Sequence, residues 1–186
     1  MTQIVSVKEI YRGWSRFSLV SFRLADGAVV ERCVEDHGRT AVVLPYDPER
    51  RVALLVRQDR PGPGLAGETS GPEAPAGLID PGEDGAACAR REAFEETGLR
   101  LRELEPLGRF WSSPGSTTET AELFLARYDA EDQVGAGGGA DEHEHLELIE
   151  TPLLELGRRL DRGELGDLKL LALVQALKLR RPELFG

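Results

Sequence analysis

The sequence has few cysteines and no long apolar run, and each of these absences excludes a class of protein. Its 186 residues include two cysteines, Cys33 and Cys88, which are too few for a disulfide framework. No apolar run reaches the roughly 18 residues needed to cross a bilayer. Residues 1–14 also lack the uninterrupted apolar core of a signal peptide. We therefore expect a cytoplasmic protein with no membrane partner.

Positive charge is also scarce, because the formal net charge is −10. This balance argues against a nucleic-acid partner, which is usually held by a broad basic surface. An anionic small molecule is still compatible if a metal ion and a few arginines supply positive charge locally. The chain is long enough for one domain with a substantial core and a little short for two.

The rest of the chain is organised around residues 77–99. A turn at residues 80–82 precedes a helix that is expected to begin after Asp84, because an aspartate side chain can accept the free N–H groups of a first turn. Gly98 is expected to end the helix, since glycine tolerates the left-handed conformation found at many helix ends.

Three acids occupy the end of this helix where negative charge is unfavourable. Glu92, Glu95 and Glu96 lie in its last two turns, where the macrodipole disfavours each carboxylate by roughly 0.3–1 kcal/mol. Glu92 and Glu96 also form a like-charge pair at i,i+4 spacing. Two carboxylates on one helix face suit Mg²⁺, which prefers oxygen ligands. A solvated acidic face is the alternative, and Arg91 is placed to pair with Glu95.

The stretch resembles the Nudix box, G-x5-E-x7-R-E-U-x-E-E-x-G-U, in which U is aliphatic. Leu99 fits the last aliphatic position, and Ala93 is a small version of the first. All seven fixed positions of the box are matched, by Gly77, Glu83, Arg91, Glu92, Glu95, Glu96 and Gly98.

Alternation and turn signals predict a β-rich first third, with helices after the box and at the end of the chain. Strands are expected within 11–34 and at 40–44, 52–56, 107–111, 121–128 and 146–150. Helices are expected from Pro152 to about Arg162 and from Asp167 to Arg180. The last helix is expected to bury a stripe of Leu168, Leu171, Val174 and Leu177.

Taken with the resemblance, this pattern implies an α/β (α+β) protein with the Nudix fold. That fold is an α/β/α sandwich with a mixed β-sheet, here preceded by an N-terminal antiparallel strand region. We expect residues 1–38 to form this N-terminal β-region, which would take part in dimerisation, and residues 39–186 to form the Nudix hydrolase domain.

Three features outside the box are further candidates, each with a structural alternative. The acidic loop at residues 141–145 either is solvated or closes over the box helix and adds a carboxylate and a base. Arg57 and Arg60 follow a strand and either grip a diphosphate or lie at a surface edge. Trp14 either stacks on a nucleobase or is a core side chain.

Over nearly its whole length the chain is similar to the ADP-ribose and GDP-mannose pyrophosphatases of the Nudix superfamily. The acidic loop is one matching piece, and the others are Tyr11–Trp14, Ala41–Pro45, Arg57–Arg60, Pro75–Gly77 and Ser113–Gly115. Pro114 lies fifteen residues after the box, near the place where the ADP-ribose group carries a proline, whereas the glycines at 137–139 look more like the GDP-mannose branch.

The resemblance implies a Mg²⁺-dependent hydrolase, with Mn²⁺ as a substitute metal, that cleaves a nucleoside diphosphate sugar to a nucleoside monophosphate and a sugar phosphate. The metal ligands would be the carbonyl of Ala76 and the carboxylates of Glu92, Glu96 and Glu144. Glu142 would be the general base. The remaining implied site residues are Glu95 and Arg91 as catalytic groups, and Arg60, Arg57, Trp14 and Pro114 around the substrate.

The same resemblance implies a homodimer. Two other functions stay open. One is a Nudix hydrolase of another nucleoside diphosphate compound or of a dinucleoside polyphosphate. The other is a non-catalytic sensor of nucleotide sugars.

Overall fold

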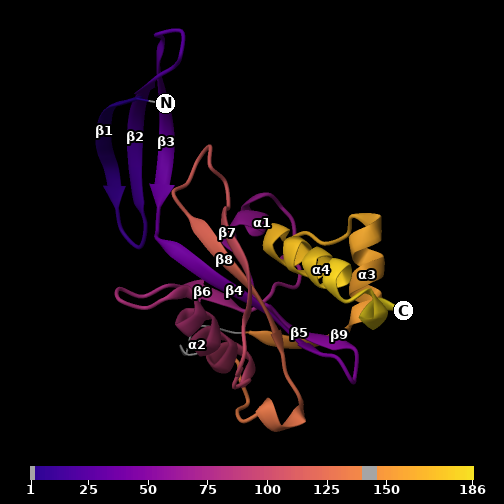
Figure 1. Ribbon diagram of the computed structural model, residues 1–186. Helices are drawn as coiled ribbons and strands as arrows, with labels where there is room; N and C mark the ends of the chain where they lie inside the picture. The colour runs from indigo at the N-terminus through magenta and orange to yellow at the C-terminus, as the bar shows by residue number, and fades with distance from the viewer. Residues whose placement is uncertain (1–2, 140–145) are drawn as a thin grey trace. The chain divides into compact units, whose positions relative to one another are not determined.

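The computed structural model describes residues 3–139 and 146–186, and it divides into two compact units (Figure 1). The first unit comprises residues up to Thr40 together with Arg109–Ala121. The second unit comprises Ala41–Gly108 and Glu122–Gly186.

The first unit is built on a three-stranded antiparallel sheet in the order β1-β2-β3. A tight turn joins β2 to β3, in which the N–H of Gly27 donates to the carbonyl of Leu24 at 3.0 Å. The sequence did not predict β1, whose ten residues are all exposed and so carry no burial pattern. The strands are β1 (Gln3–Arg12), β2 (Arg16–Arg23) and β3 (Val29–Asp36).

The second sheet has the strand order β7-β8-β4-β5-β9, and β6 pairs with β4 (Figure 1). The five strands predicted after residue 39 all lie in it, with each predicted end within three residues of the observed one. They are β4 (Arg39–Asp47), β5 (Val52–Arg57), β7 (Glu105–Trp111), β8 (Thr120–Arg127) and β9 (Glu147–Pro152), joined by the short β6 (Ala76–Leu78).

Helices cover both faces of this sheet. Helix α2 (Gly85–Thr97) buries Ala89 and Ala93 against Ala41 and Val43 of β4. The intervening residue Val42 points to the opposite face, because side chains alternate along a strand, and it is fully buried there. Helices α3 (Leu153–Arg162) and α4 (Leu168–Arg180) lie on that side of the strands in Figure 1. The layering is the predicted α/β/α sandwich.

The buried stripe of α4 differs from the predicted one. Leu168 is 72% exposed and Leu171 is only partly buried, whereas Leu170 and Leu173 are fully buried beside the predicted Val174. The helix has leucines in almost every direction, so its apolar periodicity could not define which face packs.

Three short helices complete the chain. A single-turn helix, α1 (Pro61–Leu65), lies in the segment between β5 and β6. The 3₁₀ turns are η1 (Ala130–Asp132) and η2 (Pro182–Phe185). Among the helices of residues 3–139 and 146–186, none has both the length and the apolar character that crossing a bilayer requires.

Candidate functional site

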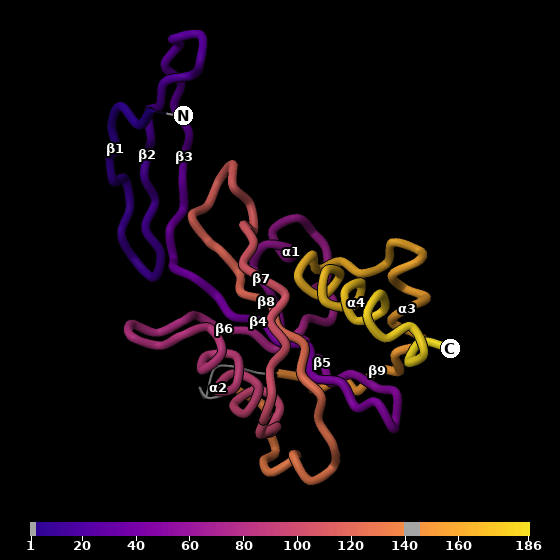
Figure 2. Tube along the Cα trace, viewed as in Figure 1, coloured from indigo at the N-terminus to yellow at the C-terminus, as the bar shows by residue number. Residues whose placement is uncertain are grey.

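Helix α2 begins and ends where its sequence predicts. The carboxylate of Asp84 accepts a hydrogen bond from the N–H of Ala87 at 2.7 Å, as an N-cap does. Gly98 adopts a left-handed φ of 74°, and its N–H donates to the carbonyl of Phe94 at 2.8 Å. The chain reaches this helix from β6 through a turn, and the two elements lie next to each other (Figure 2).

The acids of this helix do not form a solvated face. Cys88, Glu92 and Glu96 recur every four residues and so lie on one stripe, next to the stripe that packs on the sheet. Glu96 is 2% exposed, and the side chain of Glu92 is 13% exposed. The alternative of an ordinary solvated acidic surface is therefore wrong for these two residues.

Both carboxylates reach the backbone of β6. An oxygen of Glu96 accepts the N–H of Ala76 at 3.1 Å. The carboxylate of Glu92 occupies the space that a Cβ at residue 77 would need, so only glycine fits there beside it. This arrangement brings Glu92, Glu96 and the Ala76–Gly77 backbone together.

These donors fit a divalent metal ion by their chemistry, because carboxylate and backbone carbonyl oxygens are the ligands that hard cations such as Mg²⁺ prefer. Within residues 3–139 and 146–186, no group of three or more acidic, histidine or cysteine side chains is arranged to hold a metal. Two further predicted residues, the ligand Glu144 and the base Glu142, lie outside the residues that the structure describes.

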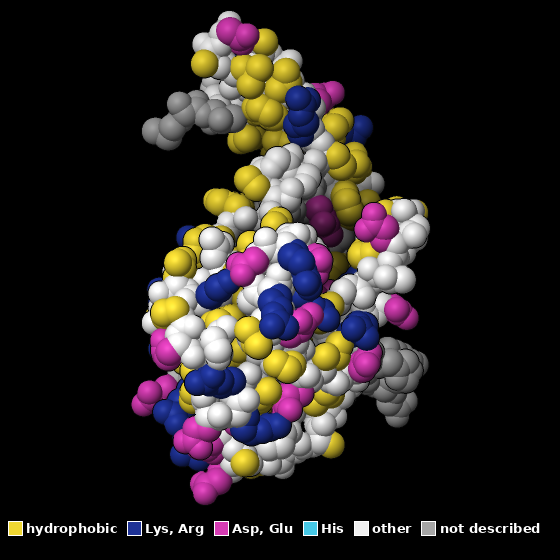
Figure 3. Space-filling model, turned by 90° about the vertical axis from the view of Figure 1, so that its right-hand side faces the viewer, with side chains coloured by type: hydrophobic (Ala, Val, Ile, Leu, Met, Phe, Trp, Pro, Cys, Tyr) yellow, Lys and Arg dark blue, Asp and Glu magenta, His cyan; other side chains and the backbone are white. Residues whose placement is uncertain are grey.

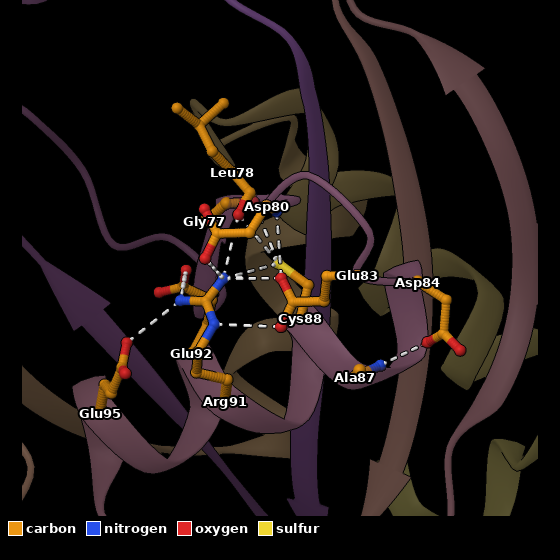
Figure 4. A network of polar contacts seen from close by, with 10 residues as sticks. All are labelled: Gly77, Leu78, Asp80, Glu83, Asp84, Ala87, Cys88, Arg91, Glu92 and Glu95. Carbon is orange, nitrogen blue, oxygen red and sulfur yellow. Dashed lines mark hydrogen bonds and ion pairs between the residues drawn. The ribbon is translucent and has the colours of Figure 1, made fainter.

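Arg91 lies at the centre of the polar network in Figure 4. Its Nε and Nη2 atoms donate to the two carboxylate oxygens of Glu83 at 3.1 and 3.0 Å, and Nη2 also donates to the carbonyl of Leu78 at 3.0 Å. Its Nη1 donates to Glu92 at 2.5 Å and to Glu95 at 3.2 Å. The predicted pairing of Arg91 with Glu95 is present. One guanidinium therefore ties the helix to the preceding turn and offsets the charge of three acids.

The sequence showed Glu83 as a box position but gave it no role. In the structure the hydrogen bond from Arg91 holds the pKa of Glu83 below its ordinary value. The same bond is the largest cause of the raised pKa of Arg91. The two residues are eight apart in sequence, a spacing that bridges a turn and a helix and has no simple periodic signal.

Cys88 lies on the same helix stripe as Glu92 and Glu96. Its side chain is fully buried, and its Sγ lies 3.3 Å from the carbonyl oxygen of Leu78. Burial raises the pKa of this thiol to about 12, which keeps it protonated at neutral pH.

Both candidate arginines at the end of β5 are ion-paired. Arg57 donates to Glu147 at 2.8 Å, with its side chain 44% exposed. Arg60 donates from Nε and Nη2 to Glu73, at 2.8 Å for the shortest contact. Glu73 was not singled out in the sequence, although it immediately precedes the Ala74–Gly77 segment that reaches α2.

Trp14 belongs to the first unit and is not a core residue. It is 77% exposed, and its indole stacks on the imidazole of His37 with ring centres 5.2 Å apart and planes 21° apart. The expected alternative of a buried tryptophan is therefore wrong. The indole forms part of the wall of a hollow of about 440 Å³. The hollow is lined by Arg12, Gly13, Trp14, Arg16, Asp36, His37 and Gly38.

Pro114 also belongs to the first unit. It is exposed in a turn where the carbonyl of Ser113 accepts the N–H groups of Ser116 and Thr117, each at 3.0 Å. Its position is that of a surface loop residue.

Comparison with known proteins confirms the resemblance carried by the box. The NUDIX domain matches residues 36–174. GDP-mannose pyrophosphatase of Cronobacter sakazakii is 39% identical over 159 residues, which cover 83% of this chain and 82% of that protein. GDP-mannose pyrophosphatase of Escherichia coli is 33% identical over 185 residues, covering 95% and 96%.

A solved structure entitled "Crystal structure of ADP compounds hydrolase" superposes with a TM-score of 0.76 at 19% identity. The match covers 97% of this chain and 96% of that chain. At this identity the likeness concerns the fold, and it confirms the predicted mixed α and β architecture.

Proposed function

We propose that this chain, which belongs to the NUDIX domain family, hydrolyses the pyrophosphate bond of a nucleoside diphosphate sugar. The products would be a nucleoside monophosphate and a sugar phosphate. One observation carries the proposal. The buried carboxylate of Glu96 and the largely shielded carboxylate of Glu92 meet the backbone of Ala76–Gly77 in a chain that matches GDP-mannose pyrophosphatases almost end to end. GDP-mannose and ADP-ribose are the substrates that we favour.

The proposed metal ligands are the carbonyl of Ala76 and the carboxylates of Glu92, Glu96 and Glu144. A divalent cation bound there, Mg²⁺ or in its place Mn²⁺, would neutralise diphosphate charge and lower the pKa of a water molecule. The two glutamates of α2 are suited to this task because the fold has already removed them from bulk water and turned them toward β6.

The remaining catalytic groups have separate tasks. We assign Glu142 as the base that removes a proton from the attacking water. Arg91 and Glu95 act from the helix, where the guanidinium holds the carboxylates of Glu92 and Glu95 in place through bonds of 2.5 and 3.2 Å. Fixed orientation matters because phosphoryl-type transfer depends mainly on positioning and charge neutralisation.

We propose four residues for binding the substrate. Arg60 binds the diphosphate, with Arg57 as a second cation near the end of β5. Trp14 stacks on the nucleobase, which its 77% exposure permits. Pro114 contributes from its exposed turn.

We further propose a division of the chain into residues 1–38, which mediate homodimerisation, and residues 39–186, which form the hydrolase domain. Strand β1 lies at an edge of its sheet, where backbone groups are available to another strand. Figure 3 shows hydrophobic side chains gathered over this N-terminal region. The exposed apolar residues of β1 are Ile4, Val5, Val7, Ile10 and Tyr11, each about half exposed or more. Such a surface suits a second copy of the chain.

A cytoplasmic location is also proposed. It is supported by the two free thiols, of which Cys33 is exposed and Cys88 is buried. An exposed free thiol suits a reducing compartment.

The proposal is tested by steady-state hydrolysis of GDP-mannose, ADP-ribose, other nucleotide sugars and dinucleoside polyphosphates, each with and without Mg²⁺. Metal-dependent release of a nucleoside monophosphate from a nucleotide sugar is the expected result. Preferential cleavage of a polyphosphate would assign a different Nudix substrate. Tight binding of a nucleotide sugar without any turnover would identify a sensor and overturn the enzymatic function.

A further inference from the structure

The ion pair between Arg60 and Glu73 uses one edge of the guanidinium. Nε lies 3.1 and 3.2 Å from the two oxygens of Glu73, and Nη2 lies 2.8 Å from one of them. Among the described residues, no hydrogen bond is made by Nη1. Since a guanidinium is a planar fork with five donors, a carboxylate on one edge fixes the plane and still leaves donors for a second anion.

Glu73 is itself held rigidly. Its N–H donates to the carbonyl of Val56 at 2.8 Å, and its carbonyl accepts the N–H of Val56 at 3.0 Å. Val56 is a buried residue of β5, and Ala74, next to Glu73, is buried as well. The backbone that carries the carboxylate of Glu73 is therefore fixed to the core sheet, and the Glu73 side chain is only 13% exposed.

The same short segment leads directly to the proposed metal site. Two residues after Glu73, the carbonyl of Pro75 accepts the N–H of Val43 at 3.0 Å, and the N–H of Ala76 donates to Glu96. The charge of Glu96 also contributes to the raised pKa of Arg60, after the larger effect of the hydrogen bond to Glu73. Arg60 thus lies within electrostatic range of a proposed metal ligand.

The backbone of Arg60 is hydrogen-bonded at both its N–H and its carbonyl, which accepts the N–H of Gly64 at 3.2 Å, whereas its long side chain is held by Glu73. Arg60 lies in the loop after β5, where its N–H donates to the hydroxyl of Ser70 at 2.8 Å. An arginine on such a loop has several rotatable bonds and loses much side-chain freedom when it is fixed. A rigid acid that holds the guanidinium beforehand removes that cost from the binding step.

We propose that Glu73 is a positioning residue for substrate binding, which holds the guanidinium of Arg60 so that its remaining donors face the diphosphate. This inference rests on the proposed function, in which Arg60 binds the diphosphate. The alternative is a purely structural role, in which the Arg60–Glu73 ion pair only closes the loop between residues 60 and 73. Loss of the pair would then reduce the stability of the protein and leave its substrate affinity unchanged.

The test compares Glu73→Gln, Arg60→Gln and the double variant as full-length protein, with GDP-mannose as substrate. Since a charge-assisted hydrogen bond is involved, Glu73→Gln is expected to raise KM about five- to twentyfold and to leave kcat within about twofold. In the Arg60→Gln background the same change should raise KM by less than about twofold, because Glu73 would act through Arg60. A matched control is Glu150→Gln, which breaks the exposed pair between Arg50 and Glu150 on the same sheet and should leave KM unchanged.

Three outcomes would overturn the inference. One is an unchanged KM in Glu73→Gln, and another is a full additional loss in the double variant. The third is a lowered KM, which would make Glu73 a competitor of the substrate for Arg60. If Glu73→Gln does not fold, as judged by thermal melting, Glu73→Asp replaces it, because it keeps the charge and shortens the reach; a normal KM there would equally reject the inference.

Binding of GDP, measured by calorimetry in Mg²⁺, separates this inference from the proposed function. If the wild-type protein hydrolyses no nucleotide sugar but binds GDP more tightly than Glu73→Gln does, the function fails and the positioning role stands. If the wild-type protein hydrolyses the sugar nucleotides and both variants at Glu73 match its KM, the function stands and the positioning role fails.

Discussion

The carboxylate of Glu92 lies in the space beside Gly77 that a Cβ would fill. The atoms that a methyl group at residue 77 would displace are the far end of a flexible side chain, so the displacement costs little stability. It would nevertheless move a proposed metal ligand. We therefore predict that Gly77→Ala changes the free energy of unfolding by less than about 1 kcal/mol and lowers Mg²⁺-dependent turnover by about tenfold or more.

Thermal melting and kcat/KM for GDP-mannose check this prediction. Gly71→Ala is the control, because Gly71 has open space around its Cα and no left-handed φ, and it should behave like the wild-type protein. Full activity in Gly77→Ala would contradict the role given to this close approach.

The carboxylates proposed as metal ligand and as base should respond differently to removal of their charge. Glu96→Gln is expected to weaken Mg²⁺ binding and to reduce turnover by about 100-fold or more, because a neutral amide is a poor ligand for a hard cation. Glu142→Gln should lower kcat with the affinity for Mg²⁺ retained, since a base acts on water and need not touch the metal.

Metal affinity measured by calorimetry, next to kcat, distinguishes the two variants. The control is Glu103→Gln, which changes an exposed glutamate. If Glu142→Gln lost its metal, Glu142 would take the ligand role assigned to Glu144. Near-normal turnover in Glu96→Gln would refute the metal site on α2.

The Arg91–Glu83 pair predicts a pH-dependent contribution to stability. The pKa of Glu83 in the folded protein lies below its ordinary value of 4.5, because Arg91 donates to its carboxylate. Its stabilisation is therefore fully present above about pH 4.5 and is lost as the pH falls through the lower folded-state pKa. At pH 7, Glu83→Gln should cost about 1–2 kcal/mol, as expected for weakening a charged hydrogen bond.

Melting curves of the wild-type protein and Glu83→Gln, recorded from pH 7 down to pH 3, measure this difference. The gap between the two melting temperatures should narrow below pH 4.5. A gap that stayed constant through this range would show that the charge of Glu83 does not stabilise the fold.

The sequence predicted α2 well because its signals are local. Asp84 and Gly98 are capping residues whose preferences arise from hydrogen bonding and backbone conformation at a single position. The partner of Arg60 is not local in this sense. Glu73 lies thirteen residues away across a loop, and only the pairing of its backbone with Val56 brings it beside the arginine.

Exposure was harder to predict than secondary structure. Trp14 is large and apolar and yet lies in solvent, and Leu168 is exposed at the start of a helix with leucines on every side. Burial depends on which other element packs against a surface. The identity of a single side chain does not tell which element that is. Strand β1 escaped prediction for the same reason, because none of its residues is buried in this chain.

The stack of Trp14 on His37 predicts graded effects on substrate binding. Trp14→Ala should raise KM for GDP-mannose by about tenfold or more, since stacking of a base on an aromatic ring contributes roughly 1–3 kcal/mol. His37→Ala should have a smaller effect in the same direction, because the indole would lose the ring that orients it. Steady-state kinetics measure both effects. Trp111→Phe, which changes the other tryptophan, is the control, and an unchanged KM in Trp14→Ala would remove this residue from the binding site.

The exposed edge strand β1 predicts how the chain assembles. Val7 lies in this strand and is 63% exposed, as one of several exposed apolar residues of β1, and an apolar surface of this kind can mark an interface. Lysine is a residue that natural sheets use to prevent pairing at an edge. If copies of the chain pair through the N-terminal sheet, Val7→Lys should convert dimers to monomers while the box helix keeps its fold.

Light scattering after size-exclusion chromatography gives the mass of the assembly directly. Leu179→Lys is the matched control, because it places the same charge on an apolar residue of helix α4 that is also well exposed, at 77%. Dissociation by Val7→Lys alone would place the interface on β1, whereas a monomeric wild-type protein would reject the proposed dimer, and dissociation by both variants would mean that added charge, and not the site of the change, separates the copies.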